Sequence, residues 1–529
     1  MGDGVRVRVS ARLGDGKSES VAEVFRSYSA GGEQLETVLT GSMGYYDLEP
    51  FVIVEKPNAP AICYANVTDD IAAGICERWL NGDDPMPEVA LCTLSGDGYE
   101  AIKPQTALPL FQIQRRVATR RCGFTNPLSI KNCIEEFDGY AGFKQAAQIT
   151  PDSILDRVNK TALPELDGHG EPVFPKWKAF QSIAGGEKTI VCTALDNDVE
   201  ARIARLLLEG DPHGTLEGLL ITALAVGASH AVIAVPADTG RIYPVLENAL
   251  SEMREFGLPG KEILESGFDC DISIREVPRA LVSYEKTALL NCLEGLQPIP
   301  SLSGKSGDML FGNPALVTGI ETLANLPQIL LSGSGSPTDN GLPGITGTKL
   351  MTLSGGICHA YTLELPFGVS IATTVRDIGG AERVKAVQFG GLTSVFFNTD
   401  AMEKPINYET AKEAGSDFGL SLINVVPESV CAVETAEEIM RILHDESCGK
   451  CVFCREGTLH LRQMLSDVIN GRNEDRDFEL MTEIGLQMKS GCICALGLTA
   501  ANPVLSALAL FRSDFERYSK RHTAAGIRD

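Results

Sequence analysis

Four cysteines near the C-terminal end constrain the fold of this chain more than any other feature. Cys448, Cys451 and Cys454 form a C-x2-C-x2-C triplet in ESCGKCVFCREG, and Cys494 follows in SGCICALG. A triplet at this spacing places three thiolates on one tight turn that leads into a helix, and a fourth thiolate from a distant segment can close a tetrahedral set. The chain must therefore fold so that these two segments meet.

Sulfur ligands in this number favour an iron–sulfur cluster. Thiolates select iron–sulfur clusters or zinc, and zinc sites more often use two separate cysteine pairs. We therefore predict one [4Fe-4S] cluster bound by the four cysteines, with structural zinc as the alternative. Cys492 competes with Cys494 for the fourth position, because residues two apart on a helix point in different directions and only one should reach the centre. Such a cluster indicates electron transfer.

Composition limits the class of protein. With 529 residues, 44% of them hydrophobic and 22% charged, the chain should form several soluble domains. It has neither a run of about 18 apolar residues that could cross a membrane nor an apolar signal segment at the N-terminus. Its 15 cysteines look unpaired and suit a reducing compartment, so we expect a cytoplasmic protein without direct membrane insertion. The net charge of −24 argues against nucleic acid as a partner.

Strand-like and helix-like segments alternate through much of the chain. Residues 1–100 contain short apolar strands and amphipathic helices, which predicts a small α/β domain, and residues 101–125 indicate a linker. In residues 126–330, strand-like segments such as TIVCTAL and HAVIAVPA alternate with long apolar helices. This alternation predicts a largely parallel sheet with helices on both faces.

The C-terminal part changes character twice. A glycine- and proline-rich loop at 332–346 precedes strand-like segments, and together they predict a compact mixed domain over residues 331–425. Residues 426–529 predict a four-helix bundle. Its amphipathic segments are TAEEIMRILHDE, LHLRQMLSDVING, DFELMTEIGLQMKS and NPVLSALALFRSDFERY. The cysteine triplet begins one of these helices, so the bundle can gather the four sulfur atoms at one end.

The cluster segment resembles that of a known family. ESCGKCVFCREGT, together with CALGLTAANPVLSALALFRSDFE, is similar to the cluster-binding region of the NADH-binding flavoprotein subunit of respiratory complex I. The homologous subunits of bifurcating hydrogenases and NAD-linked formate dehydrogenases share this region. LLLEGDPH (206–213), KTALLNCLEG (286–295) and IETLANLP (320–327) are similar to further stretches of the family, so the resemblance covers nearly the whole chain.

The resemblance implies a domain order and a kind of partner. The implied order is a thioredoxin-like domain, a Rossmann-like flavin domain, a ubiquitin-like β-grasp (SLBB) domain and a four-helix iron–sulfur domain. It also implies that Cys494, which precedes Ala-Leu-Gly, is the fourth cluster ligand. Because the family works in multisubunit assemblies, we expect partner subunits that carry iron–sulfur or flavin centres.

The flavin loop departs from the family pattern. The family has a glycine-rich G-R-G-G-A-G-F-P loop, whose glycines let backbone N–H groups approach a phosphate closely. Residues 168–175 here are GHGEPVFP, so Glu171, Pro172 and Val173 replace Gly, Ala and Gly. The glutamate adds negative charge, the proline lacks an N–H group, and the valine fills space that glycine leaves open. All three changes oppose the binding of a phosphate.

Two further flavin-facing segments have changed. The family sequence N-A-D-E-S-E-P-G matches residues 193–200, TALDNDVE, in which the amide and one carboxylate are lost. The family sequence C-G-E-E-T matches residues 283–287, where Tyr284 replaces the glycine and Lys286 replaces the second glutamate. The residues that remain of the family's flavin site are Gly168, Gly170, Asp196 and Glu285. We therefore predict a degenerate flavin site.

The thioredoxin-like part shows the same kind of loss. The family places two cysteines in T-G-C-x-G-x-C-E, which matches TGSMGYYD at 40–47, so Ser42 and Tyr46 stand at the cysteine positions. No cysteine precedes Cys63, so the family's earlier pair is also absent. Because a [2Fe-2S] cluster needs four ligands, we expect no cluster in this domain.

Together these patterns predict an electron-transfer and scaffold subunit of a multisubunit redox complex. It would carry one [4Fe-4S] cluster and would have lost FMN, NAD(H) and NADH oxidation, because NADH oxidation requires the flavin as hydride acceptor. The alternative is a working FMN-dependent NAD(P)H oxidoreductase subunit with an altered pocket. A structural zinc-binding subunit is the third hypothesis.

Overall fold

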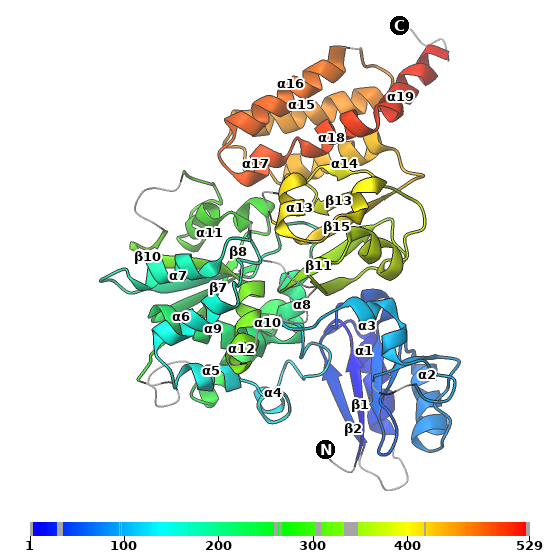
Figure 1. The fold of residues 1–529 in the computed structure, drawn as a ribbon, viewed down its shortest axis with the longest axis vertical. Coiled ribbons are helices and arrows are strands. Elements are labelled where there is room, and N and C mark those ends of the chain that lie inside the picture. The colour runs from blue at the N-terminus through cyan, green and yellow to red at the C-terminus, as the bar shows by residue number, and fades with distance from the viewer. Residues whose placement is uncertain are drawn as a thin grey trace.

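Three sheets and a helical C-terminal end make up the chain. The computed structural model describes residues 4–28, 35–94, 96, 98–168, 170–237, 240–258, 263, 267–302, 308–332, 347–416, 419–474 and 476–524. Within them, three five-stranded sheets precede the C-terminal helices (Figure 1), which confirms the expected multidomain α/β class. The glycine- and proline-rich loop expected at 332–346 lies outside the described residues, except for Ser332, as does His169 of the flavin loop.

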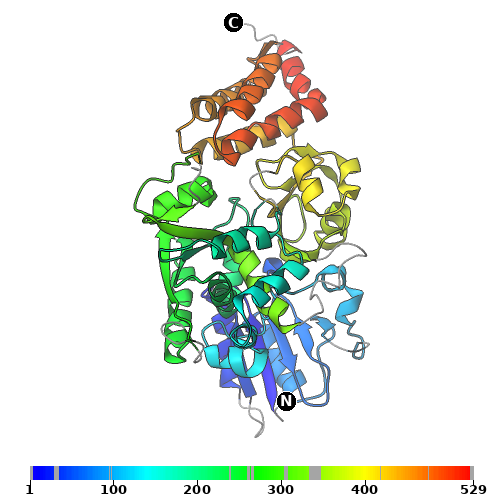
Figure 2. The same cartoon turned by 60° about the vertical axis from the view of Figure 1, so that its left-hand side comes forward.

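The first sheet lies at the end of the molecule opposite the C-terminal helices (Figures 1 and 2). Its strand order is β2-β1-β3-β4-β5, and β1 pairs parallel with β2 and antiparallel with β3. The strands are β1 (Val5–Ser10), β2 (Leu35–Thr40), β3 (Phe51–Glu55), β4 (Ile62–Tyr64) and β5 (Ala90–Thr93), and the helices α1 (Lys17–Ser27) and α2 (Asp69–Gly74) pack on them. The alternation VRVRV buries Val5, Val7 and Val9 in one core, because successive strand residues point to opposite faces.

The second sheet has the expected parallel pairing. Its order is β8-β7-β6-β10-β9, in which all neighbours except β9 pair parallel. The strands are β6 (Thr189–Thr193), β7 (His230–Pro236), β8 (Asp271–Val277), β9 (Met309–Leu310) and β10 (Asn313–Gly319). The helices around it are α4 (Ile130–Phe137), α5 (Ala141–Ala146), α6 (Pro151–Lys160), α7 (Val173–Gln181), α8 (Ile203–Gly210), α9 (Pro212–Val226), α10 (Ile242–Glu255), α11 (Lys286–Leu293) and α12 (Ile320–Leu331).

Helices cover both faces of this second sheet, as expected. Ile190 and Cys192 of β6 belong to the core that includes α9 and α12, whereas Val191 between them packs with Leu289 of α11. Helix α9 is buried along nearly its whole length, and it approaches α12 closely at Gly218. Because both faces are covered, the strands read as continuous apolar runs.

The third sheet is mixed, with order β12-β11-β15-β13-β14. Its strands are β11 (Thr348–Gly355), β12 (Thr362–Pro366), β13 (Val384–Gly390), β14 (Phe396–Phe397) and β15 (Leu422–Pro427), with α13 (Tyr408–Glu413) beside them. Strand β11 pairs antiparallel with β12 and parallel with β15. This sheet lies beside the parallel-sheet unit, between the first sheet and the C-terminal helices (Figure 1).

The C-terminal end is helical, but its last expected helix is broken. The helices are α14 (Ala432–Asp445), α15 (Val452–Ile469), α16 (Arg476–Gly491), α17 (Ala495–Thr499), α18 (Asn502–Leu510) and α19 (Arg512–Ala524). The segment expected as one helix at 502–518 divides at Phe511, and the two parts of 495–518 are bent by 83°. The bend places Phe515 against Phe478, with ring centroids 5.7 Å apart, so burial of an aromatic side chain overrides helix continuity.

Membrane-spanning character is weak in the described residues. No single helix there is both long and apolar enough to span a bilayer, and only the bent pair at 495–518 meets the length and composition test.

A buried carboxylate fixes the segment between the first two sheets. Glu364 of β12 is 1% exposed and accepts hydrogen bonds from the backbone N–H groups of residues 117–119, each at 3.0 Å. The hydroxyl groups of Thr119 and Thr348 donate to the same carboxylate at 2.7 and 2.6 Å. The segment 101–125, expected as a linker, contains the short helix α3 (Pro109–Ile113) and is held against the third sheet by these bonds.

A buried ion pair joins the second and third sheets. Lys349 of β11 pairs with Glu321 of α12, and both side chains are almost fully buried. The Glu321 carboxylate also accepts the backbone N–H of Leu350 at 2.6 Å, and the Lys349 ammonium donates to the carbonyl of Leu350 at 2.9 Å. Each charge is therefore satisfied only when α12 and β11 keep this arrangement.

Removing one member of this pair should destabilise the chain strongly. We expect Lys349→Met to cost about 3–5 kcal/mol, because it leaves the Glu321 carboxylate buried without its cation. The measurement is the midpoint of urea unfolding. The double variant Lys349→Met/Glu321→Gln should recover much of the loss, and Arg441→Met, which removes an exposed ion pair to Glu438, should leave the midpoint unchanged. A single variant as stable as the native chain would contradict this account.

Candidate functional site

The cysteine triplet forms the turn that begins α15. Cys451 is the N-cap of this helix, and Cys454 is buried in its first turn. Gly449 has a φ of 74°, a left-handed conformation that glycine adopts without strain. Its carbonyl accepts a hydrogen bond from the Arg455 side chain at 2.7 Å. The turn leading into a helix is thus built as the spacing suggested.

Cys494 reaches the same end of the helices from the N-cap of α17. This short helix contacts both α15 and α16. Burial is the largest cause that raises the pKa of the Cys494 thiol to about 11, and the nearby Cys454, Cys448 and Cys451 add to it. The structure therefore brings the four predicted cysteines into one neighbourhood.

Cys492 makes the direct contact with the triplet. Its side chain hydrogen-bonds with Cys454, which lowers the pKa of Cys454 to about 7 and raises the pKa of Cys492. Gly497 leaves room for this contact, because a Cβ atom there would lie 3.0 Å from the Cys492 sulfur. Sequence reasoning allowed only one of Cys492 and Cys494 near the triplet, whereas the fold places both there.

The donor set at this end suits an iron–sulfur cluster. All of the candidate ligands are thiols, and the N-terminus of α15 favours the negative charge of a cluster. Ser447 also lies 3.3 Å from the Cys454 sulfur, within reach of a hydrogen bond to it. In the part of the chain that the structure describes, no three cysteine, histidine or carboxylate side chains are already grouped closely enough to hold a metal ion.

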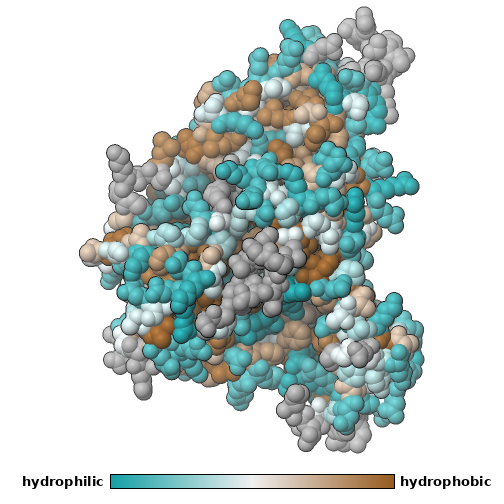
Figure 3. Space-filling model, viewed as in Figure 1, coloured by the Kyte–Doolittle hydropathy of each residue, from teal (hydrophilic) through white to brown (hydrophobic). Residues whose placement is uncertain are grey.

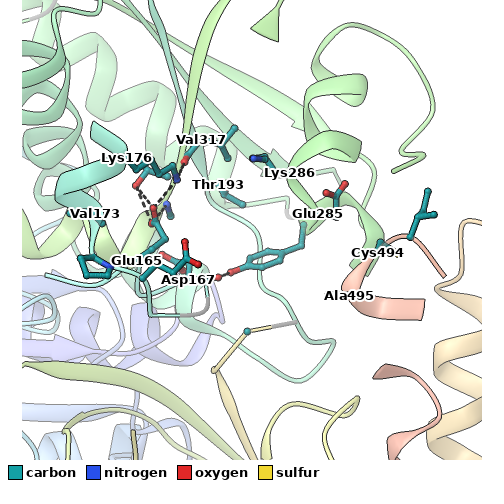
Figure 4. A pocket seen from close by; sticks show the side chains of 18 residues that line it. Glu165, Asp167, Val173, Lys176, Thr193, Glu285, Lys286, Val317, Cys494 and Ala495 are labelled. Carbon is teal, nitrogen blue, oxygen red and sulfur yellow. Dashed lines mark hydrogen bonds and ion pairs between the residues drawn. The ribbon is translucent and has the colours of Figure 1, made fainter. Parts of the chain in front are cut away.

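A cavity of about 430 Å³ adjoins the cysteine segment. Its walls come from the carboxyl ends of β6 and β10, from the start of α11 and from Cys494 with Ala495 (Figure 4). The segment before α7 and the start of α7 add Glu165, Asp167, Gly168, Glu171, Pro172 and Val173. Of the predicted flavin-site residues, Gly168 and Glu285 line this cavity, whereas Gly170 and Asp196 do not. The cluster segment and the flavin-type cavity therefore share a wall.

Tyr284 occupies part of this cavity. Its side chain projects from the segment before α11, and its hydroxyl donates a hydrogen bond to the backbone carbonyl of Asp167 on the opposite wall. Burial raises the pKa of Tyr284 well above its usual value, and the neighbouring Asp167 adds to the shift. The phenol ring thus bridges two walls of the cavity.

Two backbone N–H groups of the flavin loop donate to nearby backbone carbonyls. The N–H of Val173 donates to the carbonyl of Leu163 at 3.0 Å, and the N–H of Gly168 donates to the carbonyl of Glu165 at 3.2 Å. Gly170 is required for a different reason, since a Cβ atom there would lie 2.3 Å from the ring of Tyr408. The glycine at 170 therefore serves packing against the third sheet.

Acidic side chains that sequence reasoning missed form one wall of the cavity. Glu165 accepts hydrogen bonds from Lys176 and from the N–H of Gly319, both at 3.0 Å, and although burial alone would raise its pKa, Lys176 and these bonds hold it below the usual range. Burial, followed by the charge of Glu321, raises the pKa of Asp167 well above normal. No motif marks these positions, because their role depends on segments that meet only in the fold.

The remaining predicted residues, Glu285 and Asp196, cap helices. The Glu285 carboxylate accepts the N–H of Ala288 at 2.8 Å at the start of α11. The Asp196 carboxylate accepts the N–H groups of Ile203 and Ala204, both at 3.0 Å, at the start of α8. Both carboxylates are therefore committed to backbone donors.

Two glycines in the segment 40–47 allow the first sheet to dock closely. A Cβ atom at Gly41 would lie 2.3 Å from the carbonyl oxygen of Glu209, and one at Gly44 would lie 2.1 Å from the carbonyl oxygen of Thr362. The N–H of Thr362 also donates to the carbonyl of Gly44 at 2.9 Å. Both positions therefore need glycine for close packing between the units.

Ser42 and Tyr46, which the resemblance places at two cysteine positions of the family, both make hydrogen bonds. The Ser42 hydroxyl donates to the Glu49 carboxylate and accepts the N–H of Gly44 at 2.9 Å. The Tyr46 hydroxyl donates to the hydroxyl of Thr362 at 3.2 Å. Ser42 thus bonds within the first unit, whereas Tyr46 bonds across to the third sheet.

Comparison with known proteins identifies the family. Residues 158–328 match the family described as the Nuo51 FMN-binding domain, and residues 434–518 match the NADH-ubiquinone oxidoreductase-F iron-sulfur binding region. The NADP-reducing hydrogenase subunit HndC of Solidesulfovibrio fructosivorans is 32% identical over 77% of this chain and 84% of its own length. This chain belongs to the Nuo51 family.

Other relatives agree with this assignment to the Nuo51 family. A second relative, an NADH-quinone oxidoreductase subunit of Rhizobium meliloti (strain 1021), is 32% identical over 71% of this chain and 91% of its own length. A crystal structure of an NAD+-reducing [NiFe]-hydrogenase in the H2-reduced state superposes with a TM-score of 0.68 at 20% identity, covering 99% of this chain and 88% of that chain, which shows a shared fold. The four predicted cysteines and the residues that line the cavity, apart from Gly419, fall within the two matched regions.

Single cysteine replacements should identify the fourth ligand. We expect Cys494→Ser to lose most of the bound iron, as Cys454→Ser should, because a cluster needs four protein ligands. Cys492→Ser is the matched control and should keep the iron. Iron and acid-labile sulfide per chain, measured after anaerobic purification, decide between them. Retention of iron by Cys494→Ser together with its loss from Cys492→Ser would assign the role to Cys492.

Proposed function

We propose that this chain is an electron-transfer subunit of a multisubunit redox complex that has lost FMN- and NADH-dependent catalysis. It would carry one [4Fe-4S] cluster on Cys448, Cys451, Cys454 and Cys494, which supplies one-electron transfer when bound. The match of residues 434–518 to an iron-sulfur binding region supports the cluster. The turn at the start of α15 and the N-cap of α17 would hold it beside the cavity.

The position of Tyr284 carries the proposal that the flavin is lost. It stands where the family has a glycine in a flavin-facing segment, and its ring lies within the cavity with the hydroxyl bound to the carbonyl of Asp167. A planar ligand would have to displace the ring, break this bond and leave a buried carbonyl without its donor. Such a loss costs about 1–3 kcal/mol before any contact with the ligand is gained.

Electrostatics of the cavity also oppose a phosphate group. Its walls include Glu165, Asp167 and Glu171. The lysines there are already paired, Lys176 with Glu165 at 3.0 Å and Lys286 with Asp308 at 3.0 Å. A phosphate nest needs free N–H groups and close backbone approach, whereas Pro172 has no N–H and the N–H groups of Gly168 and Val173 already donate to backbone carbonyls.

The domain assignment that accompanies this function follows the resemblance. We infer a thioredoxin-like domain at 1–100, a linker at 101–125, a degenerate Rossmann-like flavin-type domain at 126–330, an SLBB domain at 331–425 and a four-helix cluster domain at 426–529. The strand orders of the three sheets support three separate α/β units. A cytoplasmic location fits the unpaired cysteines.

Partner subunits would dock near the cluster. Hydrophobic side chains gather on the helical end of the surface (Figure 3). Val452 and Phe453, which stand between two cluster cysteines, are 58% and 46% exposed. Exposed apolar side chains beside a redox centre suit a protein interface, and the named relatives are subunits of a hydrogenase and of an NADH-quinone oxidoreductase.

One observation favours the alternative of a working flavin enzyme. The FMN-binding domain family matches residues 158–328, and a cavity of about 430 Å³ persists beside Tyr284. In that case Glu171 and Lys286 would alter specificity while the flavin stays bound.

Cofactor analysis of the anaerobically purified chain distinguishes the electron-transfer subunit from a working flavin enzyme. We expect about four iron atoms and four acid-labile sulfides per chain, with no flavin absorbance and no bleaching on addition of NADH. Zinc in place of iron would select the structural hypothesis. Stoichiometric FMN that NADH reduces would overturn the proposed loss of catalysis.

Restoring the family residues should restore flavin binding. We expect the combined variant Glu171→Gly/Pro172→Ala/Val173→Gly/Tyr284→Gly to bind FMN at least about tenfold more tightly than the native chain, because it frees N–H donors and the space of one ring. Tyr284→Phe keeps the ring and should gain nothing. Quenching of flavin fluorescence measures the affinity. Equal binding by the native chain and the combined variant would show that these positions do not control the site.

A further inference from the structure

A second and larger cavity lies on another side of the parallel sheet. Its volume is about 750 Å³, and its walls include Leu195 after β6, Pro236 at the end of β7 and Pro278 after β8. It thus lies beyond the carboxyl ends of β6, β7 and β8, whereas the flavin-type cavity lies beyond β6 and β10. Crevices outside the carboxyl ends of parallel strands are where open α/β sheets bind small ligands.

Arginine dominates the charged side chains of this cavity. The five that line it are Arg12, Arg202, Arg205, Arg241 and Arg279. They converge from the first sheet, from the start of α8, from the start of α10 and from the segment after β8. Such a concentration of positive charge stands against a net charge of −24 for the whole chain.

The carboxylates in the same walls do not neutralise these arginines. Asp196 is committed to the N-terminus of α8, as described above. Asp198 accepts the N–H groups of Leu392 and Glu200 at 2.7 and 3.0 Å, and Glu446 accepts the N–H of Leu281 at 2.7 Å. Each carboxylate therefore serves a backbone donor.

Three of the arginines lack an ion pair within the described residues. Arg205 pairs with Glu209 at 2.8 Å, and Arg241 donates to backbone carbonyls of residues 13 and 14. Arg12, Arg202 and Arg279 are exposed and lie within 4 Å of no carboxylate that the structure describes. Their charge is available to a ligand.

The arginines that line this cavity repel one another. Partial burial is the largest cause that lowers the pKa of Arg12, and the positive charges of Arg205, Arg241 and Arg202 add to it, while the charge of Glu209 opposes the shift. Like charges held this close cost free energy that a bound anion would recover. The N-terminus of α10, which begins at this wall with Ile242, adds a further site of positive potential.

We propose that this cavity binds a small ligand with two or more linked phosphate groups, either a nucleoside di- or triphosphate or inorganic pyrophosphate. Guanidinium groups bind phosphate oxygens with two parallel hydrogen bonds, so several converging arginines suit a polyphosphate better than a single carboxylate. The cavity volume is within the range of about 300–1,000 Å³ typical of small-molecule sites. No residue lines both this cavity and the flavin-type cavity, although Leu195, Asp196 and Asp198 belong to the segment 193–200 that resembles a flavin-facing sequence of the family.

The ligand would also join two parts of the chain. Arg12 belongs to the segment after β1, and Arg241 of the parallel-sheet unit already binds carbonyls at residues 13 and 14. A polyphosphate held by Arg12 and Arg202 would therefore tighten the contact between the first and second sheets.

Calorimetric titration of the full-length chain in low salt tests the proposal. The probes are ADP, ATP and pyrophosphate, with AMP as a single-phosphate comparison. We expect the polyphosphates to bind more tightly than AMP, and Arg202→Ala and Arg279→Ala each to weaken binding by about tenfold or more. Arg472→Ala, an exposed arginine between α15 and α16, is the matched control and should leave the affinity unchanged.

The titrations identify which ligand binds, and they also show whether the proposed site exists. If ADP binds more tightly than pyrophosphate, the ligand is a nucleotide. If the two bind equally, the ligand is inorganic pyrophosphate. Both outcomes support the site. The ligand should also raise the thermal unfolding midpoint of the native chain and of Arg472→Ala. It should not raise the midpoint of Arg202→Ala or Arg279→Ala, and this pattern would support the site in the folded protein. Absence of polyphosphate binding at millimolar concentration, or binding that both variants retain, would overturn it. None of these readouts depends on iron or flavin content.

Discussion

Buried carboxylates at the seams between the sheets hold this structure together. Glu364 gathers three backbone N–H groups of the segment before the parallel-sheet unit, and Glu321 binds both an ammonium and a backbone N–H of β11. A buried carboxylate that loses its donors is costly, and its hydrogen bonds are directional. Each such group therefore fixes the position of a neighbouring element more tightly than apolar packing alone would.

Two kinds of contact connect the parts of this chain. Gly41 and Gly44 permit close backbone approach to neighbouring units, because any Cβ atom there would overlap a carbonyl oxygen. Tyr284 bridges the flavin-type cavity by donating a hydrogen bond to the carbonyl of Asp167. The first kind of contact depends on the absence of a side chain, and the second depends on a large one.

Predictions from the sequence were correct where the spacing of apolar residues or cysteines depends on local structure. The alternation of apolar strands and helices correctly predicted a parallel sheet covered on both faces, and the thiolate spacing correctly predicted a turn into a helix at Cys451. It failed at Phe511, where an aromatic contact to a distant helix breaks a continuous amphipathic pattern. The assignment of Gly170 and Asp196 to a flavin site stays a prediction, and the structure adds that Gly170 packs on Tyr408 and that Asp196 caps α8.

The sequence by itself determined the ligand type at the cysteine end and the absence of glycine from much of the flavin loop, because both are properties of adjacent residues. Only the tertiary structure decided that Cys492 contacts Cys454 and that arginines from four separate segments converge on one cavity. The reason is physical. The spacing of residues along the chain determines which side chains are neighbours within one turn or one strand. Contacts between domains depend instead on which buried donors and acceptors form hydrogen bonds in the folded state.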